Sequence, residues 1–161
     1  MKNLFTHAVS KAFSALIMLA FFPVLVSSQI VSAPGGGLWN STSTWIGGTI
    51  PTAATDVIIA SNVLVNGGSC RNLQVNAGAL LQNNNASSYN LFVNGNVLNN
   101  GTISNGSSFG LILYLTGNLT NNGTMSNNTI TLNGTTNQQI SSTQVMSVGT
   151  FSKNVGNGRA L

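Results

Sequence analysis

Few side chains in this chain could carry out acid–base or nucleophilic chemistry. Among its 161 residues there is one carboxylic acid side chain, Asp56, and one histidine, His7. Hydrolysis of a glycosidic bond generally uses a pair of carboxylates, and a Ser-His-Asp or Cys-His site needs a histidine beside its nucleophile. The composition therefore predicts a protein that is not an enzyme.

Residues that could bind a metal ion are equally scarce. A zinc site takes three or four Cys, His or acidic ligands, and this composition cannot gather them, so no metal and no other cofactor is expected. The alternative is a calcium site built from Asp56 and several backbone oxygens, because calcium accepts both kinds of oxygen ligand.

The single cysteine, Cys70, allows two interpretations. Without a second cysteine in the chain it forms no intrachain disulfide. It could be a reactive thiol or form an intermolecular bridge, but no histidine or cluster of cations lies near it in the sequence to lower its pKa. We favour the other interpretation, a small buried apolar residue.

The net charge of +4 would suggest a nucleic-acid partner, but the distribution of the charges argues against one. Two of the five cations, Lys2 and Lys11, belong to the N-terminal segment described next. The other three are scattered at Arg71, Lys153 and Arg159. A phosphate-binding surface needs several cations on one face, so no nucleic-acid partner is expected.

Residues 1–28 have the layout of a secretory signal peptide. A basic, acid-free start precedes the apolar run at residues 12–26, and small residues follow where a signal peptidase would cleave, near Gln29. A membrane anchor is the alternative, but the apolar run is shorter than the roughly 20 residues that cross a bilayer. We predict export to the extracellular space or the cell surface, with no membrane span after cleavage.

The rest of the chain repeats itself. "GNVLNNGTI" begins at Gly95, and its near copy "GNLTNNGTM" begins at Gly117. Four related phrases surround these two: "LQVNAG", "LFVNGN", "LYLTGN" and "ITLNGT", which begin at Leu73, Leu91, Leu113 and Ile130. Repetition at intervals near 20 residues is typical of solenoids.

The phrases alternate apolar and polar residues, which is the period of a β-strand with one face buried. Asn-Gly is also a strong hairpin signal, so an antiparallel sandwich is an alternative. Similar strands that return in the same sense favour a parallel β-helix with three short strands in each coil. The residues expected to face inward are Leu73, Val75, Leu91, Val93, Leu113, Leu115, Ile130 and Leu132. Those expected to face outward are Gln74, Phe92, Tyr114 and Thr131.

Stacked coils also explain the unusual polar composition. Each turn position recurs at the strand spacing, so a column of like charges would repel, whereas Asn amides can hydrogen-bond along a column. Charged residues are only 4% of the chain. Gly95, Gly117 and Gly134 are expected at turn positions with positive φ.

Residues 29–56 differ from the repeats and are predicted to cap the first coil of the solenoid formed by residues 57–161. Trp39 and Trp45 would cover its end, and Asp56 would accept hydrogen bonds from backbone amides of the preceding turn. The alternative for the two tryptophans is an aromatic platform that binds sugars.

The segments "STSTWIGGTIPTAATDVIIAS" and "CRNLQVNAGALL", together with the repeated phrases, resemble the N-terminal regions of bacterial secreted or cell-surface β-helix repeat proteins. Many of those proteins carry a C-terminal sorting domain for type IX secretion. The resemblance implies an all-β, right-handed parallel β-helix and a role in surface display or adhesion. The chain stops after "FSKNVGNGRAL" without a sorting domain, so we expect a truncated relative with incomplete coils at its C-terminus.

The expected function is therefore that of a non-catalytic structural or adhesion module. The alternative is a carbohydrate-binding module, or a non-catalytic fragment of a larger polysaccharide-active β-helix protein. Phe92 and Tyr114, on neighbouring coils, are the candidate aromatic contacts for surface glycans. Self-association end to end is also expected, because no cap is apparent over the coil that begins near Ile130.

Overall fold

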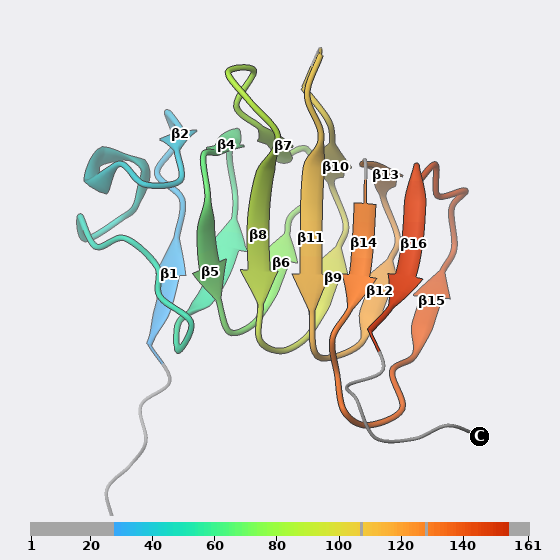
Figure 1. Ribbon diagram of the computed structural model, residues 1–161. Coiled ribbons are helices and arrows are strands. Elements are labelled where there is room, and N and C mark those ends of the chain that lie inside the picture. The colour runs from blue at the N-terminus through green and yellow to red at the C-terminus, as the bar shows by residue number, and fades with distance from the viewer. Residues whose placement is uncertain (1–27, 107, 128, 155–161) are drawn as a thin grey trace, which may run out of the picture.

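The computed structural model describes residues 28–106, 108–127 and 129–154. Residues 1–27 of the predicted signal peptide lie outside these residues, and so does Arg159. The described chain is nearly all β-structure, with a single short 3-10 helix, η1, at Thr42–Thr44. Its strands form three sheets that run side by side along one axis, from β1 at the N-terminal end to β16 at the C-terminal end (Figure 1).

Each sheet collects one strand from successive coils. The first sheet contains, in order, β1 (Gln29–Val31), β3 (Asp56–Ile59), β6 (Leu73–Val75), β9 (Val97–Asn99), β12 (Leu119–Asn121) and β15 (Ile140–Ser142). The second contains β2 (Gly37–Leu38), β4 (Val63–Val65), β7 (Leu80–Asn83), β10 (Thr102–Ser104) and β13 (Thr124–Ser126). The third contains β5 (Gly68–Cys70), β8 (Tyr89–Val93), β11 (Leu111–Leu115), β14 (Thr129–Leu132) and β16 (Thr150–Lys153).

The chain visits the three sheets in rotation, so β9, β10 and β11 form one coil and β12, β13 and β14 form the next. Every pairing between these strands is parallel. The predicted parallel β-solenoid is confirmed, with about five turns. The antiparallel sandwich is excluded.

The register explains why the chain spells one phrase twice. Val97 pairs with Leu119 in the first sheet, and Ile103 pairs with Met125 in the second. The two copies therefore lie directly on each other along their whole length. Because each position meets its counterpart about 4.8 Å away, similar residues at both positions keep the coils in register.

One of the four related phrases lies in a different sheet from the other three. Leu91, Leu113 and Ile130 do pair with one another in the third sheet. Leu73 instead lies in the first sheet, between Val57 and Val97. Its phrase matched by apolar alternation, a property that strands of all three sheets share, so alternation alone could not say which side of the coil it occupies.

The core is a stack of apolar side chains enclosed by the three sheets. All eight residues predicted to face inward are buried. Four asparagines are buried with them: Asn83, Asn99, Asn121 and Asn127. Asn99 donates from Nδ2 to Asn121 Oδ1 at 2.7 Å and also accepts from the Gly101 backbone N–H, so its amide is hydrogen-bonded on both sides. Hydrogen bonding of this kind offsets the cost of burying a polar group.

The prediction for the turn glycines was wrong. Positive φ values occur at other glycines, such as Gly67 and Gly78, but not at Gly95, Gly117 or Gly134. These three glycines are needed instead because neighbouring coils approach each other closely at their positions. A Cβ on Gly117 would lie 2.5 Å from the backbone oxygen of Gly95 one coil below, and the other two glycines are equally crowded.

The N-terminal segment is part of the solenoid as well as its end. β1 and β2, from residues 29–38, begin the first and second sheets. The chain then folds back, so that Ser32 forms an antiparallel bridge with Trp45 and the Ile46 N–H donates to the Val31 carbonyl. This return segment covers part of the edge of β1.

Candidate functional site

Phe92 and Tyr114 form a stacked pair on the outer face of the third sheet. They are direct partners in the β8–β11 ladder, with ring centroids 4.9 Å apart and planes at 17°. Phe92 is 43% exposed, and Tyr114 is half-buried. The structure therefore brings together the two residues that the sequence singled out.

The separation of the two rings decides what they can contact. It matches the strand spacing of about 4.8 Å, so one ring lies over the other along the solenoid axis and each covers one face of its neighbour. A flat platform for sugars would present ring faces side by side. Aromatic pairs of this kind contribute about 0.5–1.5 kcal/mol beyond their buried area. Their geometry is explained by cross-strand stacking, and a ligand-binding role for Phe92 and Tyr114 stays a prediction.

The two tryptophans lie inside the N-terminal end of the solenoid. Trp39 is 0% exposed and Trp45 2% exposed, and they meet edge to face at 5.1 Å. Trp45 Nε1 donates to the Trp39 carbonyl at 2.8 Å. Gly68, in the first strand of the third sheet, makes room for Trp39, because a Cβ there would lie 2.3 Å from the indole nitrogen. Neither ring has a free face for a sugar.

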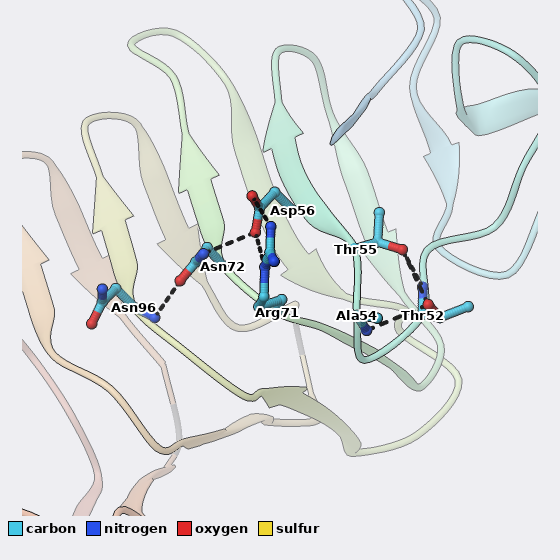
Figure 2. Close-up of polar contacts among 7 residues, drawn as sticks. All are labelled: Thr52, Ala54, Thr55, Asp56, Arg71, Asn72 and Asn96. Carbon is cyan, nitrogen blue, oxygen red and sulfur yellow. Dashed lines mark hydrogen bonds and ion pairs between the residues drawn. The ribbon is translucent and has the colours of Figure 1, made fainter. Parts of the chain in front are cut away.

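Asp56 is held by side chains of the next coil (Figure 2). Its carboxylate accepts hydrogen bonds from Arg71 Nε at 2.7 Å and from Asn72 Nδ2 at 2.8 Å, and it forms an ion pair with the same guanidinium. This hydrogen bond raises the pKa of Arg71. The nearby turn closes separately, through a hydrogen bond between Thr52 and Thr55. The Asp56 charge is therefore balanced by a cation of the chain itself.

A column of side chains continues from Asp56 along the first sheet. We call Asp56, Asn72, Asn96, Asn118 and Gln139 the amide column. The Asn72 Oδ1 accepts the Asn96 backbone N–H at 2.8 Å, Asn96 does the same for Asn118 at 2.8 Å, and Asn118 for Gln139 at 2.9 Å. Figure 2 shows the first links. Asn72, Asn96 and Asn118 thus each join their coil to the next.

A depression of about 260 Å³ lies beside the amide column, on the outer face of the first sheet. Five polar residues and four apolar ones line it: Gln29, Asp56, Asn72, Gln74, Asn96, Val57, Ile58, Leu73 and Leu98. Sequence reasoning missed this depression. An Asn recurs just before the β6, β9 and β12 strands. That recurrence was the available signal for the column.

Cys70 is buried in the core, at the end of β5. Burial raises the pKa of its thiol from 9.0 to about 12, with a smaller contribution from the Asp56 charge. Because the thiolate is the reactive form, the side chain is inert at neutral pH in the folded chain. This environment agrees with the structural interpretation of Cys70.

The two cations of the described residues, Arg71 and Lys153, do not gather into a site. Lys153 Nζ donates to the Gly134 carbonyl and to Gln138 Oε1, both at 2.6 Å. It lies at the C-terminal end of the third sheet, whereas Arg71 lies beside Asp56 near the N-terminal end. Across the part of the chain that the structure describes, no three His, Cys, Asp or Glu side chains cluster as metal ligands would.

Comparisons with known protein families, with curated proteins and with solved structures find no match for this chain. In the described residues no helix has the length and apolar character needed to cross a membrane.

Proposed function

We propose that this protein is a non-catalytic structural or adhesion module of the bacterial cell surface or extracellular space. The observation that carries the proposal is the amide column. Its polar side chains bond from coil to coil, as Asn72 does to Asn96 and Asn96 to Asn118. Groups engaged in this way build a surface of fixed shape and little charge, which suits display better than acid–base chemistry.

The chemistry of the reactive side chains supports the same conclusion. Asp56 is neutralised by Arg71, and the buried Cys70 thiol stays protonated. A general acid or base works best when its pKa is near the working pH and when it lies within hydrogen-bonding reach of the substrate. The only carboxylic acid side chain of the chain is thus committed to an ion pair, as a structural role requires.

The proposal includes export of the chain and its relationship to exported β-helix proteins. The signal-peptide layout of residues 1–28 and the resemblance to type IX-exported β-helix proteins support secretion of the chain. The test is the N-terminus of the secreted chain, measured by mass spectrometry. A chain that begins near Gln29 supports the proposal, and intact Met1 in a membrane fraction contradicts it.

Two partners remain within the proposal. Surface glycans are one. End-to-end self-association is the other, favoured by three exposed apolar residues of the C-terminal coil: Ile140, Val145 and Phe151. Sedimentation velocity of the mature chain decides the second point. Concentration-dependent association that Val145→Lys and Phe151→Lys weaken supports it, and a monomer at all concentrations contradicts it.

Incubation of the pure mature chain with a panel of polysaccharides tests the absence of catalysis. We expect no release of reducing ends or unsaturated products. Turnover that Asp56→Asn abolishes would show that the ion pair is part of an active site, and would overturn the structural role.

A further inference from the structure

Two parallel columns of outward-facing side chains form the depression on the first sheet. Ile58, Gln74 and Leu98 form its floor, and the first part of the amide column forms its wall. Strands β3, β6 and β9 place Ile58, Gln74 and Leu98 in one outward-facing column, because these three residues pair in register. The amide column runs parallel to it at the start of the same strands. The column of Ile58, Gln74 and Leu98 stands on strands that pair with a neighbouring strand on each side. Asn72 and Asn96 lie in the turns immediately before β6 and β9, where each is hydrogen-bonded to the next coil.

The wall and floor carry polar atoms that the protein leaves available. Asn96 uses Oδ1 to accept from Asn118, and its Nδ2 has no partner among the described residues. Gln74 donates from Nε2 to Asn76 Oδ1 at 2.8 Å, and its Oε1 is left without a partner there. The depression therefore offers both a donor and an acceptor, as a hydroxyl group requires, since hydroxyls donate and accept.

The charge of the depression selects against ionic ligands. Asp56 is the one charged residue in its lining, and Arg71 already balances it. A phosphate or a uronic acid would approach that carboxylate without a second cation to bind it. A cation would compete with the guanidinium that holds Asp56. A neutral ligand avoids both costs.

The apolar floor adds a second requirement. Ile58 and Leu98 are half-buried and lie on either side of Gln74. Alternating apolar and amide groups fit a ligand whose faces carry C–H groups and whose rim carries hydroxyls. Binding sites for small ligands commonly combine apolar lining with a few placed polar groups in this way.

We propose that this depression binds an uncharged, hydroxyl-rich glycan chain. The glycan lies along the solenoid axis, because Asn96 and Asn118 recur there at an interval of about 4.8 Å. Each uses its Oδ1 to accept the next backbone N–H, which leaves its Nδ2 to donate to successive sugars. This inference rests on the glycan-binding alternative and moves its site from Phe92 and Tyr114 to the first sheet. The structural role proposed above does not depend on it.

The test is an NMR titration of the isotope-labelled mature chain. The neutral probes are hexasaccharides of β-1,4-glucose, α-1,4-glucose and β-1,4-mannose, and hexagalacturonate is the anionic probe. We expect at least one neutral probe to shift the side-chain amide signals of Gln74 and Asn96, and hexagalacturonate to leave them unchanged. No shift with any neutral probe, or a shift only with hexagalacturonate, would overturn the proposal.

Two matched variants locate the site. Leu98→Glu places a charge in the depression, and Ile112→Glu makes the same kind of change at a half-buried outward position of the third sheet. We expect Leu98→Glu to weaken binding at least about tenfold, the scale of one altered contact in a binding pocket, and Ile112→Glu to leave it unchanged. Equal effects would overturn the assignment.

The double variant Phe92→Ala/Tyr114→Ala separates this inference from the general glycan-binding proposal. If it abolishes binding while Leu98→Glu does not, glycan binding survives on the third sheet and the first-sheet site is wrong. If it leaves binding intact while Leu98→Glu removes it, the first-sheet site is supported.

Discussion

Replacing Gly123 with alanine tests how closely the coils must approach. A Cβ on Gly123 would lie 2.1 Å from the backbone oxygen of Gly101, in the coil before it. The same oxygen accepts the Thr124 N–H at 2.8 Å. The two coils must therefore separate locally, and the hydrogen bond must lengthen or break.

The expected cost follows from three terms. Overpacking in a rigid environment costs about 1–3 kcal/mol, and loss of the Thr124 hydrogen bond about 0.5–1.5 kcal/mol. The lower entropy of the unfolded Gly123→Ala chain offsets about 0.4–1 kcal/mol of this. The free energy of unfolding should fall by about 0.5–4 kcal/mol.

Gly35→Ala is the matched control. A Cβ on Gly35 would meet no atom within 4 Å, and its φ is not positive. The same change should therefore leave stability unchanged or raise it by up to about 1 kcal/mol. The assay is urea unfolding of the mature chain, followed by circular dichroism in the β-strand region. Equal midpoints for the two variants would refute the close-approach explanation of the repeated glycines.

Two further outcomes concern the N-terminal half. Trp39→Ala should destabilise the chain by about 3–5 kcal/mol. Hydrogen-exchange protection should be lost first from β3 and β4. Unchanged protection of these strands would show that the indole is not needed at the N-terminal end of the solenoid. Cys70 should resist a thiol reagent at pH 8 in the folded chain and react fully in urea. Since burial raises its pKa from 9.0 to about 12, the thiol's contribution to stability is complete below a pH of about 9 and is lost as the pH rises toward 12. Rapid labelling of the native chain would contradict this.

The repeating part of the fold could be predicted because its signal is redundant. The phrases at Leu91, Leu113 and Ile130 share both their apolar alternation and their following turn, and they do stack in one sheet. Leu73 shared the alternation and belongs to another sheet. A period of two residues gives the inward face of a strand, but the side of the coil depends on the lengths of the turns, which vary between coils.

The candidate site was less accessible to sequence reasoning. Phe92 and Tyr114 could be placed on adjacent coils, but whether their rings would stack or lie flat depends on side-chain rotamers. The depression depends on side chains from three coils, such as Asp56, Gln74 and Leu98, which become neighbours only when the register is known. The prediction of positive φ at Gly95, Gly117 and Gly134 was wrong for a related reason. A glycine that allows two coils to approach and a glycine with positive φ look the same in the local sequence.

The amide column offers the most direct test of the central claim, that stacking of coils excludes charge. Asn96→Asp and Asn118→Asp keep the side-chain shape and the oxygen that accepts the next backbone N–H. Separately, each variant adds one exposed charge. Together, they place two carboxylates on adjacent coils about 4.8 Å apart, where the repulsion between solvent-exposed charges is about 1 kcal/mol.

The decisive measurement is a double-mutant cycle on these two positions, by urea unfolding at pH 7 and at pH 2.5. Repulsion raises the folded-state pKa of the carboxyls above the unfolded value, so the penalty is absent below about pH 4 and develops as the pH rises through the folded pKa. The stacked-coil account predicts an unfavourable coupling of about 1 kcal/mol at pH 7 that vanishes at pH 2.5. A coupling of zero at pH 7, or one that is the same at both pH values, would contradict it.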